Sequence, residues 1–379
     1  MNFELTEEQK LVQKTARDFS RTELLPGAVD RDVKKIWPKE HIKKMAELGF
    51  MGMMTSPKFN GGGMDTISYT LAMEEIARSD ASASVIMSVN NSLVCYLLEK
   101  YGSDFIKDSF LSQLASGQKL GAFSLSEPQS GSDASNMNTV AIKDGSNYII
   151  NGTKNWVTNG KYSDYVLVFA ITKKGVGHKG ISCFLVEKSF DGFEVGKPED
   201  KLGIRSSDTT ELYFDNVCVP KTHLIGKEGE GFKIALSTLD GGRIGIAAQA
   251  LGIAQSALDN SISYSKERQQ FGKPIAMNQS IQNKLADMAI EIESARLLTR
   301  KAAWLKDSKL DFGCAASMAK VYASEVAMRA STECVQIHGG YGYIKETGVE
   351  RLMRDAKITQ IYEGTSEIQR LVIARYLLK

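Results

Sequence analysis

Apolar residues recur at helical spacing from the start of the chain to about residue 117. The run 11–19 follows this period, and Thr6 with Gln9 has the pattern of a capping box before it, so a first helix is predicted here. The small and apolar run 81–98 predicts a buried helix. Three other positions suit the first turn or the cap of a helix: Pro38, Asp65 and Ser103.

The middle of the chain has a different pattern. Between about residues 120 and 224, short runs of β-type residues are separated by Gly and Asn turns, which predicts an antiparallel β domain of meander or barrel type. The candidate strands are 147–151, 164–172, 180–187 and 209–219.

Helical periodicity returns after Gly231 and continues to the end of the chain. Long candidates at 232–268, 280–306 and 311–337, joined by short links, predict an antiparallel bundle. The expected fold is multidomain α+β, with an N-terminal helical domain, a central antiparallel β domain and a C-terminal four-helix bundle. The expected boundaries are 1–119, 120–230 and 231–379.

Composition and charge narrow the classes of protein. The 379 residues are 42% hydrophobic and 24% charged, which is typical of a folded globular protein. The net charge of +2 supplies no strong field for nucleic acid or an anionic membrane, so neither is an expected partner. Acidic residues stand where a targeting peptide would carry basic ones, and no long apolar run occurs. We expect a cytoplasmic protein, or a mature organellar matrix form without its leader.

Metal and disulfide chemistry have little support in the sequence. The five cysteines form no Cys-x-x-Cys spacing and the four histidines no His-Glu-x-x-His pattern, so no metal site is expected. Cys334 and His338 share one helix face and could form a thiolate pair, but a buried, inert cysteine is the commoner situation. Residues 175–180 read Gly-x-Gly-x-x-Gly; because β-type runs lie on both sides, a turn between antiparallel strands is predicted rather than a nucleotide-binding loop.

Six segments carry a resemblance to one family. They are Leu125-Ser-Glu-Pro-Gln-Ser-Gly-Ser-Asp133, Trp156-Val-Thr158, Leu239-Asp-Gly-Gly-Arg243, Glu267-Arg-Gln-Gln-Phe-Gly272, Gln336-Ile-His-Gly-Gly340 and Ile361-Tyr-Glu-Gly-Thr-Ser-Glu367. In this order they resemble the acyl-CoA dehydrogenase family, and most of all its short-chain, butyryl-type members. The resemblance covers essentially the whole chain. It implies an FAD-dependent enzyme of fatty acid β-oxidation that converts a short-chain acyl-CoA to the trans-2-enoyl-CoA.

The resemblance also implies which residues bind FAD. Ser126 and Ser132 would offer hydroxyls to the flavin, while Trp156 and Thr158 match the residues that cover its ring and bond near N5. A set around Arg268 resembles the one that reaches across a subunit boundary to the pyrophosphate and adenosine of a neighbour's FAD, which implies an oligomer, usually a tetramer. An Arg fork and paired glycines suit a phosphate. The full cofactor-binding set is Phe123, Leu125, Ser126, Gly131, Ser132, Trp156, Thr158, Arg268, Phe271, Gln279, Gln336, Gly339, Gly340, Thr365 and Glu367.

The substrate residues follow from the same resemblance. Asp240 and Arg243 lie three apart on one helix face, where family members contact the CoA portion of the substrate; by themselves they would be a surface ion pair. Ser132 and Gly364 complete the expected substrate-binding set.

Glu363 is the expected catalytic base. It sits on a predicted bend before Gly364, with a helix beginning at Thr365 or Ser366 and Gln369 completing a capping box. In the family such a glutamate removes the α-proton of the thioester and the flavin N5 accepts the β-hydride, while the Glu363 N–H and a flavin ribityl hydroxyl bind the thioester carbonyl. Substrate binding expels water, which should raise the pKa of Glu363 toward that of the proton it removes.

Several alternatives remain open. Some family branches place the base on the helix that here carries Gly241 and Gly242, which leaves no rival carboxylate, and the arginine of glutaryl-type members matches Ser84. The alternatives are a branched or alicyclic short acyl-CoA substrate, glutaryl-CoA with less support, an acyl-CoA oxidase, or a non-catalytic CoA-binding scaffold. Electron-transfer flavoprotein is the electron acceptor that the family implies.

Overall fold

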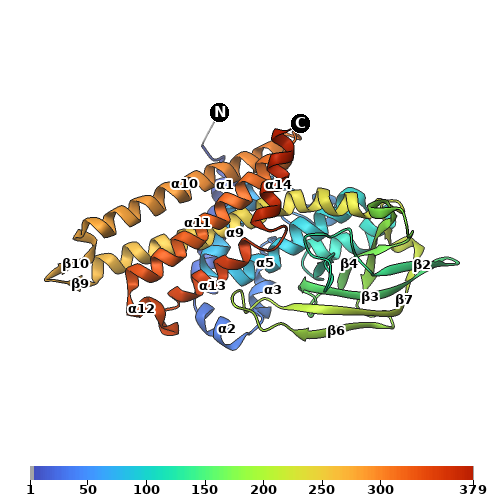
Figure 1. Ribbon diagram of the computed structural model, residues 1–379, viewed down its shortest axis with the longest axis horizontal. Helices are drawn as coiled ribbons and strands as arrows, with labels where there is room; N and C mark the ends of the chain where they lie inside the picture. Colours follow the sequence, from blue (N-terminus) through green and yellow to red (C-terminus); the bar gives the residue numbers. More distant parts are fainter. Residues whose placement is uncertain (1–3, 379) are drawn as a thin grey trace.

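A β-sheet occupies one end of the molecule and a helical bundle extends to the other (Figure 1). The structure, a computed structural model, describes residues 4–378. The N-terminal helices are α1 (Glu7–Phe19), η1 (Ser20–Leu24), α2 (Ala28–Lys34), α3 (Lys39–Glu47), η2 (Pro57–Phe59), α4 (Thr66–Ser79), α5 (Ala81–Ser88), η3 (Val89–Cys95), α6 (Tyr96–Tyr101), α7 (Asp104–Ile106), η4 (Lys107–Leu111) and α8 (Ser112–Ala115).

The predicted helix starts of this part are confirmed, with one shift. Thr6 and Gln9 form both hydrogen bonds of the capping box at α1, and Asp65 caps α4 by accepting from the Ser68 N–H (2.7 Å). Pro38 stands one position earlier than expected, as the cap residue of α3. Helix α2 was not predicted, because it is short and no side chain caps it.

The buried helix predicted from the run 81–98 is confirmed. Elements α5, η3 and α6 form one continuous helix, Ala81–Tyr101, with a π-helical stretch in its middle. By length and composition alone this helix could cross a membrane, but 94% of its most apolar window is buried inside the protein, as in a core helix.

The β domain contains β1 (Gly121–Ser124), β2 (Val140–Asp144), β3 (Asn147–Thr158), β4 (Tyr165–Ile171), η5 (Gly177–Gly180), β5 (Ile181–Glu187), β6 (Phe193–Pro198), β7 (Thr209–Pro220), η6 (Lys221–His223) and β8 (Leu224–Ile225). The strand order is β6-β7-β3-β2-β4-β5-β8, and β1 pairs with β4. All pairs are antiparallel except β1 with β4 and β2 with β4. The turn predicted at 175–180 joins the antiparallel strands β4 and β5, so it is no Rossmann loop.

The C-terminal part contains α9 (Gly231–Glu267), β9 (Gln269–Gln270), β10 (Lys273–Pro274), η7 (Ile275–Met277), α10 (Gln279–Asp307), α11 (Gly313–His338), α12 (Gly340–Tyr343), η8 (Lys345–Thr347), α13 (Val349–Thr359) and α14 (Ser366–Leu377). Helices α9, α10 and α11 match the three predicted long helices and lie along the long axis of the molecule (Figure 1). The division at residues 119/120 and 230/231 stays a prediction.

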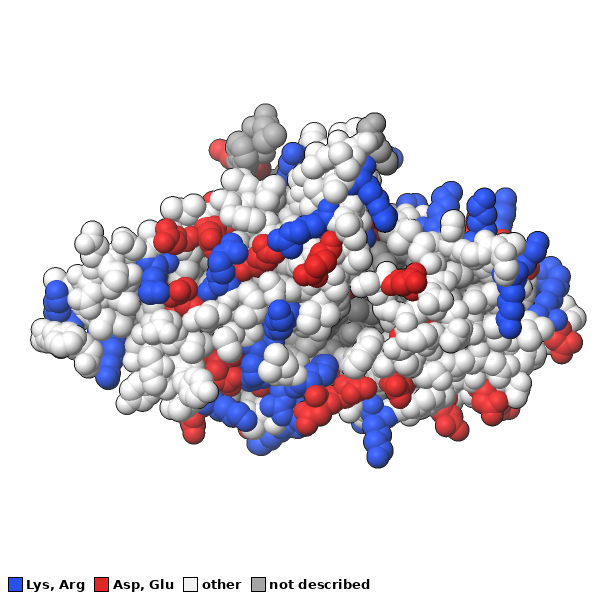
Figure 2. All heavy atoms as spheres, in the orientation of Figure 1, with Lys and Arg blue, Asp and Glu red and all other residues white. Residues whose placement is uncertain are grey.

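The three parts share one core, which positions the site. A single apolar cluster joins buried residues of the helix 81–101, the sheet and the bundle, including Leu93, Leu167 and Ile244. The turn between α13 and α14 lies where the bundle meets the sheet (Figure 1), and the surface is hollowed at this junction (Figure 2).

Candidate active site

Glu363 lies in the turn 360–365, which joins α13 to α14. The backbone angle φ is +53° at Glu363 and +95° at Gly364, so two successive residues adopt left-handed conformations. For a residue with a side chain this conformation is unfavourable and persists only where the surroundings hold it. The Ser366 N–H closes the turn by donating to the Gln360 carbonyl (2.9 Å). The backbone that carries the glutamate is therefore held in one conformation.

The start of α14 differs from the prediction. Thr365 caps the helix by accepting from the Ile368 N–H (3.4 Å). The sequence predicts a capping box completed by Gln369, and that prediction is wrong, because Ile368 occupies the third helical position. The Gln369 amide instead donates to the carbonyls of Glu363 (3.2 Å) and Gly364 (3.0 Å). Gln369 thus stabilises the turn rather than the helix end.

The carboxylate of Glu363 is buried with one oxygen unpaired. Among the described residues Oε2 has no hydrogen-bond partner. Gly242 of α9 faces it: a Cβ at this position would lie 2.1 Å from Oε2 and 2.8 Å from Leu93 Cδ2. The carboxylate can occupy this place only because residue 242 has no side chain.

The environment tunes the basicity of Glu363. Burial raises its pKa to about 7, and the positive charges of Lys320 and Arg243 oppose the rise without cancelling it. A carboxyl group with a pKa close to the working pH suits a general base, because it is ionised and still takes up a proton readily.

Two buried phenols lie near Glu363. The Tyr362 hydroxyl donates to Gln249 Oε1, and the Tyr69 hydroxyl donates to Ser88 Oγ (3.0 Å). Burial raises the pKa of both tyrosines, and the charge of Glu363 adds to the rise. Neither phenol can therefore act as a base near neutral pH.

Lys320 of α11 is a site residue that sequence reasoning missed. Its side chain has no exposed surface, and its Nζ donates to the Gly364 carbonyl (2.8 Å). Burial lowers its pKa to about 7, against the opposing charge of Glu363. The signal in the sequence is a lysine at a buried helical register otherwise occupied by alanines such as Ala316 and Ala327.

The Ser126 and Trp156 motifs lie side by side in the β domain. The Asn155 N–H donates to the Ser126 carbonyl (2.9 Å). The neighbouring Trp156 has φ +60°, its N–H donates to Asn155 Oδ1 (2.7 Å), and the residue is 61% exposed. A bulge in the pairing of β3 with β7 lies at this point and aims the ring out of the sheet.

A buried ion pair fixes the loop that carries Ser126. Lys154 of β3 donates to the Leu125 carbonyl (3.0 Å) and to Glu127 Oε1 (2.8 Å), and Glu127 accepts from the Asn138 and Thr139 N–H groups. Burial raises the pKa of Glu127, but the charge and hydrogen bonds of Lys154 outweigh it and the pKa falls to about 2. The pair is therefore ionised at neutral pH and holds residues 125–139 on the sheet.

The other residues expected at the flavin lie in this loop, on the strands beside it and at the start of α14. Phe123 on β1 packs against Phe169 with ring centroids 5.0 Å apart, and Thr158 pairs with Thr209 at the end of β3. Leu125 is buried, whereas Gly131 and Ser132 are exposed. Glu367 is exposed in the first turn of α14, beside the cap Thr365.

These residues fit a flat aromatic cofactor with a polar edge. The exposed Trp156 offers an uncovered ring face, and a side chain at Gly131 would meet nothing within 4 Å. The buried Ser124 hydroxyl has no hydrogen-bond partner among the described residues. A large exposed aromatic ring held at a positive φ is unfavourable unless another group covers it.

Asp240 and Arg243 form the ion pair that their spacing predicts, but the arginine is not at the surface. Arg243 Nη1 donates to Asp240 Oδ1 (2.6 Å) and to Ser317 Oγ (3.1 Å), and the Arg243 side chain is buried. Burial raises the pKa of Asp240, and Arg243 opposes the rise. Arg243 thus places a buried positive charge on the helix that faces Glu363.

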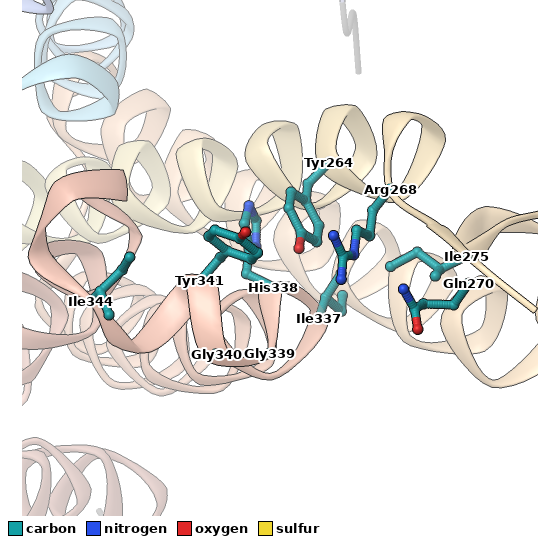
Figure 3. A pocket seen from close by; sticks show the side chains of 10 residues that line it. All are labelled: Tyr264, Arg268, Gln270, Ile275, Ile337, His338, Gly339, Gly340, Tyr341 and Ile344. Carbon is teal, nitrogen blue, oxygen red and sulfur yellow. The ribbon is translucent and has the colours of Figure 1, made fainter.

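A second group of expected residues lies at the far end of the bundle. Arg268, Gly339 and Gly340 line an open pocket of about 480 Å³, beside the stacked rings of Tyr264 and His338 (Figure 3). A side chain at either glycine would meet nothing within 4 Å. A guanidinium and two bare backbone segments suit a phosphate-bearing ligand.

One chain does not bring the two groups together. The β9–β10 hairpin beside Arg268 stands at the end of the molecule opposite the sheet that carries Trp156 (Figure 1). At the tip of this hairpin Phe271 is 96% exposed at φ +53°. Gln279 and Gln336 are also exposed near this end.

Residues 4–378 contain no cluster of three or more His, Cys, Asp or Glu side chains that could hold a metal ion. Nδ1 of His338 lies 2.8 Å from the Cys334 carbonyl oxygen and 3.8 Å from Cys334 Sγ. Burial raises the pKa of the thiol to about 11, so the cysteine is protonated near neutral pH and a thiolate is not favoured.

Comparison with known families matches most of the chain. Three family models align in order: "Acyl-CoA dehydrogenase, N-terminal domain" with residues 6–118, "middle domain" with 122–217 and "C-terminal domain" with 229–378.

Individual relatives are similar over their full length. A protein of Clostridium acetobutylicum, "Acyl-CoA dehydrogenase, short-chain specific", is 48% identical over 99% of both chains. The butyryl-CoA dehydrogenase of Megasphaera elsdenii is 49% identical and superposes with a TM-score of 0.98 over all of both chains. A chain solved in work on the electron transferring flavoprotein of Acidaminococcus fermentans is 48% identical, with a TM-score of 0.99 over all of both chains.

Proposed function

Because the chain belongs to the acyl-CoA dehydrogenase family, we propose that it oxidises the Cα–Cβ bond of a short-chain acyl-CoA, with Glu363 as the base. The observation that carries the role of Glu363 is its buried carboxylate, which has a pKa of about 7 and is faced by Gly242. Its Oε2 has no hydrogen-bond partner within residues 4–378. A structural glutamate at a helix start would instead use its oxygens to cap the helix, as Thr365 does here.

The cofactor of the enzyme is FAD, which when bound supplies the acceptor for the hydride that leaves Cβ. The loop 125–132 with Trp156 and Thr158 would hold the ring, since these residues lie together and leave an aromatic face and an open edge. Phe123, Thr365 and Glu367 would border it. Lys154 acts indirectly, because its ion pair with Glu127 shapes the loop.

Glu363 carries out the proton transfer. Its carboxylate takes the proton from Cα, and the electron pair of that C–H bond forms the new double bond. The hydride that leaves Cβ carries away the second hydrogen with two electrons, and the substrate becomes the trans-2-enoyl-CoA. The thioester α-proton is much less acidic than a carboxyl group with its ordinary pKa of 4.5. Because an acyl chain entering the site displaces water, binding should raise the pKa of Glu363 further and narrow this gap.

The substrate is held by residues of three elements in this proposal. Asp240 and Arg243 of α9 would contact the CoA portion, and Ser132 and Gly364 the region of the thioester. Ser84, which the sequence resemblance matches to the arginine of glutaryl-type members, is fully buried and donates to the Ala81 carbonyl (2.9 Å). A distal carboxylate would find no cation at this residue, which favours a monocarboxylic acyl group.

A second copy of the chain would complete the cofactor site. In one chain the Arg268 pocket is remote from the loop 125–132 (Figure 1), although both have the chemistry expected of one FAD site. The exposed Phe271 at the hairpin tip also suits burial in an oligomer. We therefore infer an oligomer, a homotetramer as the family resemblance implies, with Arg268, Gln279, Gln336, Gly339 and Gly340 reaching the FAD of a neighbour.

The electrons would pass on to an electron-transfer flavoprotein, as the similarity to a chain solved in work on such a flavoprotein supports. With a cytoplasmic location, as expected from the sequence, the protein would act in fatty acid β-oxidation.

Anaerobic titration of the purified protein with butyryl-, isobutyryl-, glutaryl- and cyclohexanecarboxyl-CoA tests this function. Loss of the oxidised flavin absorbance should be fastest and most complete with butyryl-CoA. A preference for a branched or cyclic acyl group would change the substrate class, and rapid peroxide formation in air would indicate an oxidase. A protein that neither contains nor takes up FAD would contradict the function altogether.

A further inference from the structure

Lys320 is a charged side chain in the interior of the bundle. It has no exposed surface, and nothing in the family motifs of this sequence includes it. Removing an ammonium group from water is unfavourable, so a buried lysine requires a partner and seldom adds stability. Its Nζ donates to the Gly364 carbonyl (2.8 Å), directly after the catalytic glutamate.

The Gly364 carbonyl is held from two helices. Lys320 approaches it from α11, and the fully buried Gln369 donates to the same oxygen from α14 (3.0 Å) and to the Glu363 carbonyl (3.2 Å). Because Glu363 and Gly364 both have positive φ, the direction of these carbonyls is coupled to the direction of the glutamate side chain. Loss of either donor would free the turn to relax.

The described residues give no ion pair between Lys320 and Glu363, although each influences the other. Bonding of the ammonium to a carbonyl leaves the carboxylate free to take a proton, whereas a direct ion pair would lower its basicity. The other charged groups that act on the pair are Arg243 of α9 and Glu367 of α14, while Tyr69 and Tyr362 remain neutral because burial raises their pKa values.

We propose that Lys320 is a positioning residue for the reaction: with Gln369 it clamps the Gly364 carbonyl and so fixes the turn that presents the Glu363 carboxylate to the substrate. This proposal rests on the proposed function of Glu363 as the base. Lys320 touches neither substrate nor cofactor in this proposal and acts through the turn.

The test uses the FAD-loaded protein and the variants Lys320→Met and Lys320→Arg. At saturating butyryl-CoA, the flavin of Lys320→Met should be reduced about 10- to 100-fold more slowly than that of the wild type, as expected for a misplaced catalytic group. FAD content should be unchanged and KM should change less than about threefold, since substrate contacts are intact. Lys320→Arg, which keeps a charged donor, should recover much of the rate.

The pH profile separates positioning from mere structural support. Loss of the Lys320 charge removes one of the two influences that lower the pKa of Glu363, so the rise of the rate with pH should move to higher pH in Lys320→Met. Gln369→Leu removes an uncharged donor, so it should slow the rate without moving the profile. Lys306→Met is the matched control: Lys306 is another lysine of the bundle whose pKa burial lowers, to about 8, and it contacts Met54 rather than the turn.

Each result decides the proposal. A Lys320→Met variant with the wild-type rate and pH profile would overturn it and leave the proposed function intact, whereas a wild-type protein that butyryl-CoA does not reduce would overturn the function instead. If Lys320→Met does not fold, Gln369→Leu decides: an unchanged rate of flavin reduction would contradict the clamp, and a slower rate with an unmoved pH profile would support it.

Discussion

Burial of the Glu363 carboxyl group couples the stability of the protein to pH. The pKa of this group is about 7 in the folded protein against an ordinary value of 4.5, so folding favours its protonated form. The stabilising contribution is full below pH 4.5 and is lost as the pH rises to 7, because the unfolded chain then releases a proton that the folded chain retains. Glu363→Gln removes this dependence.

We therefore expect Glu363→Gln to become more stable relative to the wild type between pH 4.5 and 7, by about 3 kcal/mol for a shift of this size. The measurement is chemical unfolding of both proteins at several pH values in this window. Parallel stability curves would show that the carboxyl group is not buried as described.

Gly242 provides a second prediction at the scale of a residue. In Gly242→Ala the new Cβ would overlap Glu363 Oε2 and Leu93 Cδ2, so the carboxylate must move. A displaced base should cost roughly 100-fold in the rate of flavin reduction. Stability should also fall, by about 1–3 kcal/mol, because the new methyl group overpacks the buried Leu93 as well as the carboxylate.

Gly241→Ala is the control for this change. It lies one position earlier on the same helix, where a Cβ would meet the end of the Lys306 side chain at ordinary contact distances (Nζ 3.7 Å, Cε 3.9 Å). Equal rates in the two variants would contradict the contact between Gly242 and the carboxylate.

Among the elements, the loop that follows β1 depends on the ion pair between its own Glu127 and Lys154 of β3. Both side chains are almost completely buried, and breaking such a pair from one side costs about 3–5 kcal/mol because the other charge is left unpaired. Lys154→Met should therefore destabilise the protein and weaken its hold on FAD, which thermal unfolding and flavin release on dilution would measure. The double variant Glu127→Gln/Lys154→Met should be more stable than the sum of the single changes predicts. An additive result would mean that the two residues do not act as a pair.

The elements also show how far the sequence predicts the fold. Helices α9, α10 and α11 were predicted nearly to their ends because they are long, periodic and free of proline. Strands β1, β2 and β6 were missed, since each has at most six residues and β2 and β6 are largely exposed or half-buried, so that no clear alternation marks them.

The site could be predicted only in part, for a physical reason. Motifs identify Glu363 and Trp156. The contacts of Gly242 with Glu363 and of Lys320 with Gly364, however, are between residues far apart in the chain. Local periodicity carries no information about such contacts. The predicted capping box through Gln369 is wrong by one residue, because α14 begins one position earlier than that motif requires.

In the whole molecule, Arg354 of α13 connects the three parts of the chain. Its guanidinium pairs with Asp32 of α2 (2.7 Å), donates to the Leu202 carbonyl of the β domain (3.0 Å) and pairs with Glu350 of its own helix. Beside it, the buried Asp355 accepts from the Ile204 N–H (2.5 Å). These contacts dock the β domain and the N-terminal helices against the bundle.

Arg354→Met should leave Asp32 and Glu350 unpaired in a largely buried place, at a cost of about 3 kcal/mol. The melting temperature should fall by several degrees, on the order of 2–4 °C per kcal/mol for a domain of 150–250 residues. Arg329→Met removes an exposed pair with Glu291 and should cost less than about 1 kcal/mol. Equal melting temperatures for the two variants would contradict the role of Arg354 at this junction.

The role of Glu363 as the base is tested most directly by anaerobic mixing of butyryl-CoA with FAD-loaded wild type, Glu363→Gln and the surface control Glu346→Gln, following the oxidised flavin absorbance. Wild type and Glu346→Gln should bleach rapidly, and Glu363→Gln should hold its FAD and bind the ligand yet bleach at least about 1,000-fold more slowly, as expected when a general base is lost. Bleaching of Glu363→Gln at the wild-type rate would show that another group removes the proton.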